Sequence, residues 1–296
     1  VAILTGFPCL LDHDPPTETD GPLGAFVIAR CCAALGKRVI VLTDDASAEV
    51  LMAAAAGCGV AGAQLSLEAF PPAAEWDDTD EERLLEVAVA ADVVVAIERP
   101  GPASDGCYYT MTGRDMGEVV APIDRLLELV STKQKHVHTI GIGDGGNEAS
   151  HVGMGKVRDA ILASAAVPSA ELITCVTPAD HLIVCSVSNW GGYALAAAAA
   201  AVACVRGAVA GPAEAAATML PDEAQETAML TRMVEAGARD GITGAAELSV
   251  DGMPLEASLQ VLRDLRATLS TAKLALPPPP PPSQPPQQPE QQRPSS

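Results

Sequence analysis

The sequence predicts an α/β protein whose mainly parallel sheet is covered by helices on both faces, a Rossmann-like three-layer arrangement. Short apolar runs alternate along the chain with longer helical segments, and the apolar runs are continuous rather than interrupted by polar residues. Strands of a parallel sheet are buried on both faces and therefore have this continuous apolar pattern. Hydrophobic residues make up 48% of the chain but aromatic residues only 3%, so we expect an aliphatic, helix-rich core.

The elements follow in order from this alternation. Apolar runs such as "VVVAI" and "LIVC" predict strands, and alanine- and leucine-rich segments between them predict helices. The expected strands are residues 2–4, 38–42, 92–97, 137–142, 172–176 and 182–185. The expected helices are residues 23–35, 46–56, 81–90, 116–131, 157–166, 192–205, 222–236 and 255–271.

The chain divides into one α/β domain, residues 1–275, and a tail, residues 276–296. The tail is rich in proline and glutamine, so it cannot build a core and is expected to be extended or disordered. An inert tail is the simpler interpretation, and docking to a proline-binding module is the alternative.

Charge and cysteine content limit the function. The formal charge is -20, from 38 acidic and 18 basic residues, and without a basic patch we expect no nucleic-acid partner and no membrane association. No apolar run is long and pure enough to cross a bilayer. The eight cysteines form no CxxC pair, which predicts reduced thiols in an intracellular compartment.

The chain begins inside a strand without Met, so we expect the native N-terminus and any targeting signal to be missing. Nothing in the sequence indicates the oligomeric state.

Unusual loops follow the expected strands: "TGFP", "TDD", "IERPG", "GDGGNE" and "SNWGGY". Ligands of open parallel sheets bind outside the carboxyl ends of the strands. We therefore expect these loops to meet in one crevice.

The segment "GIGDGGNE" is the strongest site candidate. Its glycines permit close backbone approach, and successive N–H groups can form an anion-binding nest. Asp144 and Glu148 can accept protons or bind a metal, and Asn147 can donate or accept a hydrogen bond. A tight turn capped by its own polar side chains is the alternative. The segment supplies these candidates: Gly143, Asp144, Gly145, Gly146, Asn147 and Glu148.

Other loops add polar candidates. Arg99 suits a substrate carboxylate because its guanidinium binds two oxygens at once, although a structural Glu-Arg ion pair with Glu98 is an equal alternative. Near residue 20, helix capping accounts for only part of a polar run. The further substrate-binding candidates are Thr19, Asp20, Glu98, Lys156, Ser188, Asn189 and Trp190.

A Mg²⁺-dependent phosphatase-like enzyme is an alternative, because the "GDGxND" loop of haloacid-dehalogenase-like phosphatases resembles "GDGGNE". Those enzymes also carry a D-x-D-x-[TV] nucleophile loop directly after the first strand. Here "DHDPPT" lies several residues beyond that strand and lacks Thr or Val at the fifth position.

Taken together, the motifs resemble the D-glutamate cyclase family. They are "TGFP", "TETDGPLGA", "ALGKRVIVLTD", "IERPG", "YYTM-GRD", "TIGIGDGGNE", "GMGKV", "DHLIV-SVSNWGGYAL" and "DGMPLE", in order from residue 5 to residue 256. The resemblance implies a hydro-lyase that converts D-glutamate to 5-oxo-D-proline with loss of water. It also implies a mitochondrial location, with the cytoplasm as the alternative.

For that chemistry we assign hypothetical roles. Arg99 and the glycine-loop N–H groups grip carboxylates, Asp144 or Glu148 transfers protons, and Asn147 donates hydrogen bonds. No cofactor is certain, but Asp144, Glu148 and Asp20 would suit a divalent cation, Mg²⁺ or Mn²⁺.

One segment departs from the family pattern. Residues 149–152, "ASHV", stand as an insertion between the glycine loop and "GMGKV". This insertion leaves a non-catalytic relative that binds an acidic metabolite as a further alternative.

Overall fold

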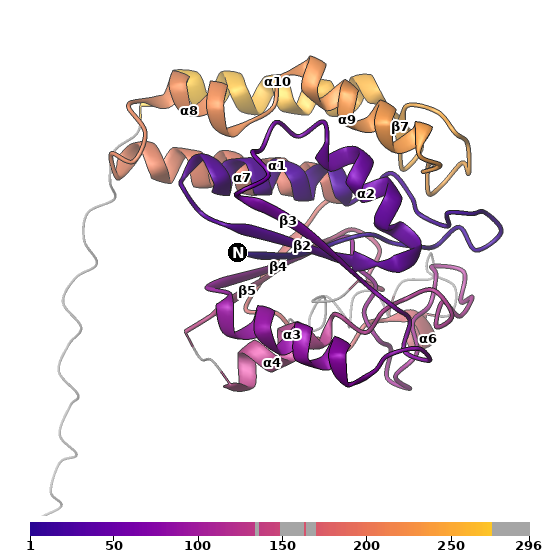
Figure 1. Ribbon diagram of the computed structural model, residues 1–296. Coiled ribbons are helices and arrows are strands. Elements are labelled where there is room, and N and C mark those ends of the chain that lie inside the picture. The colour runs from indigo at the N-terminus through magenta and orange to yellow at the C-terminus, as the bar shows by residue number, and fades with distance from the viewer. Residues whose placement is uncertain (134–135, 149–162, 164–169, 274–296) are drawn as a thin grey trace, which may run out of the picture.

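The computed structural model describes residues 1–133, 136–148, 163 and 170–273. Within this part of the chain, six parallel strands form one sheet in the order β3-β2-β1-β4-β5-β6 (Figure 1). The strands are β1 Ala2–Leu4, β2 Val39–Asp44, β3 Leu65–Phe70, β4 Val93–Ile97, β5 His138–Gly143 and β6 His181–Val184. This order is that of the doubly wound dinucleotide-binding fold, and the chain changes direction across the sheet between β1 and β4.

Helices cover both faces of the sheet, as predicted. Figure 1 shows α1, α2 and α7 on one face and α3 and α4 on the other. Their bounds are α1 Pro22–Ala34, α2 Ala48–Ala55, α3 Asp78–Ala90, α4 Arg125–Lys133 and α7 Ser188–Val205; short helices α6 Ala170–Ile173 and η1 Asp45–Ser47 lie in connections.

A further layer of helices lies beyond α1, α2 and α7. It consists of α8 Pro212–Met219, α9 Glu223–Glu235 and α10 Leu255–Thr271, together with a small hairpin of β7 Ser249–Val250 and β8 Met253–Pro254. These helices pack on α1, α2 and α7 (Figure 1). The fold therefore has four layers where the sequence predicts three.

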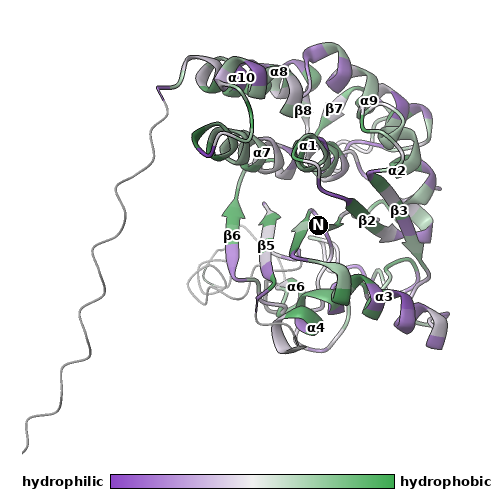
Figure 2. Ribbon diagram, turned by 60° about the vertical axis from the view of Figure 1, so that its left-hand side comes forward, coloured by the Kyte–Doolittle hydropathy of each residue, from purple (hydrophilic) through white to green (hydrophobic). Residues whose placement is uncertain are grey.

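The sheet separates two aliphatic cores. Ile3, Val41 and Val95 pack toward α1 and α7, whereas Leu4 and Leu42 pack toward α3 and α4. Both sets are fully buried, as continuous apolar strands require. In Figure 2 the hydrophobic colouring follows the strands and the helix faces turned toward them.

Helices α1 and α7 meet at two glycines near their N-termini. A Cβ atom on Gly192 would lie 2.7 Å from Cα of Gly24, a separation that a side chain cannot occupy. The side-chain oxygen of Asn189 also accepts the Gly24 N–H at 2.7 Å. The N-termini of α1 and α7 are therefore fixed against each other.

Some expected elements differ from the structure. The strand expected at residues 172–176 is wrong: the segment begins in α6 and then runs as a loop. The backbone N–H groups of this segment bond to other loops instead of to a strand: Cys175 N–H donates to Gly146 O, and Val176 N–H donates to Pro102 O. Only the last part of the helix expected at 116–131 forms, because Pro122 interrupts it.

The sequence pattern also missed β3 and α8. The alternating "LSLEAF" of β3 fits an edge strand, whose outer side is half exposed. Three expectations lie outside the described residues: the helix at 157–166, the insertion at 149–152 and nearly all of the tail at 276–296.

The expectation that no apolar run is long enough to cross a bilayer is wrong by length and composition: among the described helices, α7 alone has the length and hydropathy, because it begins at Ser188, and half of the segment is buried. It packs against α1, α8 and α10, which is the position of a core helix.

A buried carboxyl group on α9 predicts a pH-dependent stability. Glu226 and Tyr193 are fully buried, and the tyrosine hydroxyl donates a hydrogen bond to Glu226. Burial raises the pKa of Glu226 to about 7, above the value of about 4.3 in an unfolded chain. The neutral acid therefore favours folding: its contribution is complete below the unfolded pKa and is lost as pH rises through about 7.

We expect the free energy of unfolding of the wild type, relative to Glu226→Gln, to fall by about 3 kcal/mol between pH 5 and pH 8.5. Urea unfolding across this range measures the difference. Glu235→Gln, an exposed position on the same helix, should keep the wild-type pH profile. Parallel profiles for wild type and Glu226→Gln would contradict the assignment.

Candidate functional site

A pocket of about 350 Å³ lies where loops after β1, β4, β5 and β6 meet the loop that precedes and includes the β7–β8 hairpin. The predicted convergence is confirmed for four of the five strand loops, and the position is the switch point between β1 and β4. The loop after β2 does not line the pocket, because its Asp44 is buried against Arg99. The lining residues include Cys9, Glu18, Glu98, Asp144, Asn147 and Asp251.

Carboxylates dominate the pocket. Glu18, Glu98, Asp144 and Asp251 line it, and Asp20 and Glu148 lie directly behind. Within the described part of the chain, no Lys, Arg or His lines this pocket. Carboxylates this close repel one another, so protons, a cation or a cationic ligand must compensate their charge.

Asp20 is held by the start of α7. Its Oδ2 accepts the Ser188 N–H at 2.7 Å, and its Oδ1 accepts the Asn189 N–H at 2.8 Å and the Gly21 N–H at 2.9 Å. The first N–H groups of a helix have no partner within the helix, and they carry partial positive charge. Asp20 therefore occupies a preformed anion position at the end of α7.

Glu98 follows β4 directly and is 6% exposed. Its backbone has φ 39°, the left-handed region that non-glycine residues rarely adopt. Gly21, with φ 96°, allows this close approach, because a Cβ there would lie 2.7 Å from Cβ of Glu98. The Ser188 hydroxyl donates to Glu98 Oε2 at 2.5 Å. The turn after β4 thus aims the Glu98 carboxylate at the pocket.

The glycine loop does form an anion nest, but its occupant is the chain itself. Glu148 Oε1 accepts the N–H groups of Asp144 at 3.0 Å and Gly145 at 2.6 Å, and its Oε2 accepts that of Gly146 at 2.6 Å. The loop N–H groups expected to grip a substrate carboxylate are therefore bound to Glu148. The result is a rigid loop that presents Asp144 to the pocket.

The β7–β8 hairpin supplies Asp251, which the sequence analysis did not single out. Asp251 has φ 52° at the tip of the hairpin. Asp240 fixes the hairpin by accepting hydrogen bonds from Ser249 Oγ at 2.7 Å and Gly252 N at 2.8 Å. The hydroxyl of Thr19 donates to Ser249 O at 2.8 Å. Two signals pointed to this residue: the Asp-Gly pair at the turn, and the motif "DGMPLE", which begins with Asp251.

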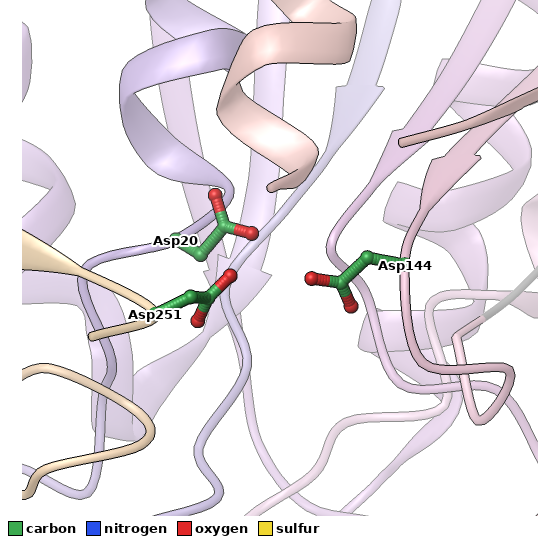
Figure 3. Close-up of side chains that lie close together, drawn as sticks. All are labelled: Asp20, Asp144 and Asp251. Atoms are coloured by element: carbon green, nitrogen blue, oxygen red, sulfur yellow. The ribbon is translucent and has the colours of Figure 1, made fainter. Parts of the chain in front are cut away.

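Two groups of acidic ligand atoms share Asp144. In the first, oxygens of Asp20, Asp144 and Asp251 lie within 4.8 Å of one another; in the second, the same holds for Glu98, Asp144 and Glu148. Figure 3 shows Asp144 pointing toward Asp20 and Asp251. The residues expected to hold a metal were Asp20, Asp144 and Glu148; the geometry places Glu148 with Glu98 instead of with Asp20.

The site environment favours the protonated form of these groups. Burial, followed by the charge of neighbouring carboxylates, raises the pKa of Glu18, Asp20 and Glu98 well above the usual range. Partial burial and the neighbours Glu148 and Asp20 raise the pKa of Asp144. Each of these carboxyl groups is therefore easier to protonate than a carboxyl group in water.

Glu18 was also missed, because it looked like one of several helix-capping residues. It is 6% exposed and lies against the Cys9 thiol. Burial, then the negative charge of Glu18, raises the pKa of Cys9, so this thiol is not an activated nucleophile.

Arg99 does not face the pocket. Its guanidinium is fully buried and binds Asp44 with both nitrogens, at 2.5 and 2.7 Å. It also donates to the carbonyl oxygens of Gly6 and Ala121. The geometry therefore favours a structural ion pair over the expected grip on a substrate carboxylate, but the partner is Asp44 and not the expected Glu98.

Several other expected contacts are structural. Asn189 joins α7 to α1 and to Thr19 O, and Trp190 Nε1 donates to Ser258 Oγ on α10. The Asn147 amide donates to Tyr109 O while the residue still lines the pocket. Lys156, one of the expected substrate-binding residues, lies outside the described residues.

A doubly wound sheet with a small pocket that carries several carboxylates at its switch point defines an α/β protein of the kind that binds small molecules at this place. Sequence comparison specifies the family. The model described as "D-glutamate cyclase-like, C-terminal" matches residues 1–266, and the chain belongs to this family. The predicted resemblance is confirmed.

One curated relative is human mitochondrial D-glutamate cyclase. It is 34% identical over 278 residues, which cover 86% of this chain and 43% of the human protein. The chain thus spans less than half the length of that relative.

Proposed function

We propose that this chain cyclises D-glutamate to 5-oxo-D-proline with loss of water. The family match and the human relative support the reaction. The observation that carries the proposal is the carboxylate pocket at the switch point of the sheet, because it supplies several proton-transfer groups around a space suited to a small metabolite. By the name of the human relative, we also propose a mitochondrial location.

The reaction is a proton-transfer problem. The amine nitrogen attacks the γ-carboxyl carbon, a C–N bond forms and a C–O bond breaks. The ammonium group loses two protons, and the departing oxygen gains two to leave as water. No net proton is exchanged, so groups that can pass protons from nitrogen to oxygen suffice.

The pocket fits this requirement. Ionised carboxylates attract the substrate ammonium, and a neighbouring protonated carboxyl group can donate to the γ-carboxylate. Glu18, Glu98 and Asp144 line the pocket and have raised pKa values. They are the candidates for proton transfer.

Glu148 and Arg99 take positioning roles in this proposal. Glu148 holds the loop that carries Asp144. Arg99 holds the turn after β4 through Asp44, next to Glu98. Both roles differ from the direct contacts expected from the sequence.

The test is to incubate purified protein with D-glutamate and L-glutamate separately and detect 5-oxoproline by chiral chromatography. We expect 5-oxo-D-proline from D-glutamate and no product from L-glutamate. A folded protein that forms no product from either would overturn the proposal, and binding without turnover would identify a non-catalytic relative.

A further inference from the structure

One wall of the pocket comes from outside the six-stranded sheet. It consists of Gly241, Ile242 and Asp251, and we call these three residues the outer wall. They lie in the connection from α9 to β7 and at the turn of the β7–β8 hairpin. Helices α9 and α10, which flank this segment, pack mainly on other helices. The outer wall therefore needs its own attachment to the loops that follow the strands.

Asp240 links the first strand of the hairpin to the turn that carries Asp251. Asp240 is fully buried, and its Oδ2 accepts the Ser249 hydroxyl at 2.7 Å and the Gly252 N–H at 2.8 Å. Hydrogen bonds to a carboxylate are stronger than those between neutral groups. A displacement of Ser249 is therefore transmitted to Asp251.

Thr19 attaches the hairpin to the loop between β1 and α1. Thr19 is fully buried, its N–H donates to Arg239 O at 2.9 Å, and its hydroxyl donates to Ser249 O at 2.8 Å. It stands in the chain between Glu18, which lines the pocket, and Asp20. The hydroxyl thus connects the carboxylate-bearing loop directly to the hairpin strand that Asp240 holds.

The other end of the outer wall is held without the Thr19 side chain. Arg239 N–H donates to Thr17 O at 3.2 Å. A Cβ atom on Gly241 would lie 1.8 Å from Oε2 of Glu18, so the backbone of Gly241 packs directly on that carboxylate. Loss of the Thr19 hydroxyl should therefore release the hairpin and Asp251 while the Gly241 end stays in place.

We propose that Thr19 is a positioning residue whose hydroxyl holds the β7–β8 hairpin so that Asp251 contacts the substrate. Thr19 itself does not line the pocket, so it acts through Ser249 and not by the direct substrate contact expected from the sequence. Small displacements of groups that hold a substrate can cost about 100-fold in rate. The substrate contact rests on the proposed function, whereas the attachment of the hairpin does not.

A double-mutant cycle tests the role in turnover. Thr19→Val removes the hydroxyl at nearly constant shape, and Thr19→Ser keeps it. We expect kcat/KM for D-glutamate to fall at least about tenfold in Thr19→Val and in Asp251→Asn, and to recover in Thr19→Ser. In the Asp251→Asn background, Thr19→Val should lower kcat/KM by less than about twofold more, because both changes remove the same contact.

Full turnover by Thr19→Val or by Asp251→Asn would overturn the inference. Losses that multiply in the double variant would also overturn it, because Thr19 would then only stabilise the fold. The matched control is Thr17→Val. Thr17 is fully buried in the same loop, but its hydroxyl donates to Ser47 Oγ at 2.8 Å. Thr17→Val should lose stability as Thr19→Val does and keep kcat/KM.

Hydrogen exchange of the hairpin amides without substrate tests the attachment itself. We expect exchange at least about threefold faster in Thr19→Val, and exchange as in the wild type in Thr17→Val and Thr19→Ser. Unchanged exchange in Thr19→Val would overturn the inference. The expected exchange pattern together with no turnover by the wild type would contradict only the proposed function.

Discussion

Asp144→Asn is expected to lower kcat/KM for D-glutamate by at least about 100-fold, because a group that binds the reacting centre or transfers its protons contributes this much. Asp144 belongs to both groups of carboxylates and points into the pocket. Asparagine has the same shape but neither charge nor a titratable proton. Steady-state kinetics with chiral product detection measures the loss.

The same substitution should leave the protein as stable as the wild type or more stable. It removes one charge from a crowded set of carboxylates, and residues in a functional site often trade stability for activity. Asp92→Asn, with the same chemical change at an exposed position, should preserve kcat/KM. Full turnover by Asp144→Asn would remove Asp144 from the site.

Arg99→Ala is expected to cost about 3–5 kcal/mol of unfolding free energy, the typical cost of leaving a buried partner charge uncompensated. Asp44 would lose both guanidinium bonds inside a fully buried environment. The loops at Gly6 and Ala121 would lose a donor each. Urea denaturation at neutral pH measures the change.

An exposed ion pair provides the comparison. Arg114 binds Asp12 at 2.7 and 3.0 Å, but both side chains are open to solvent. Arg114→Ala should lower the stability far less than Arg99→Ala, because solvent screens an exposed ion pair. The double variant Asp44→Leu/Arg99→Met should regain part of the stability lost in Arg99→Ala, because it removes both charges. A cost for Arg99→Ala as small as that for Arg114→Ala would contradict the role of the pair.

The strands with continuous apolar sequence could be predicted because burial on both faces leaves a local pattern. The edge strand Leu65–Phe70 escaped this rule, since half of its surface is polar. The segment at 172–176 has the apolar pattern but is not a strand, because its backbone N–H groups donate to carbonyl oxygens of neighbouring loops. The outer helical layer depends on packing between distant segments, which no local pattern encodes.

The position of the site was predictable from the loops after the strands, but the partners of its residues were not. Arg99 pairs with Asp44, 55 residues away in sequence, and an arginine at a strand end fits a substrate carboxylate equally well. Asp251 reaches Asp20 only through the packing of the last helical layer. The glycine loop forms the anion nest that its sequence predicts. The anion in that nest is the Glu148 carboxylate of the same motif and not a substrate.

The central claim is that the carboxylate pocket at the switch point binds the reacting molecule. A crystal structure with 5-oxo-D-proline tests it most directly. We expect the ligand between Glu98, Asp144 and the β7–β8 hairpin. A second pocket, at the opposite ends of the strands, is lined by Arg38 and Arg83 together with Glu68 and Glu86, so it offers an anion basic side chains as well as carboxylates. A ligand bound there, with the carboxylate pocket free of it, would contradict the account.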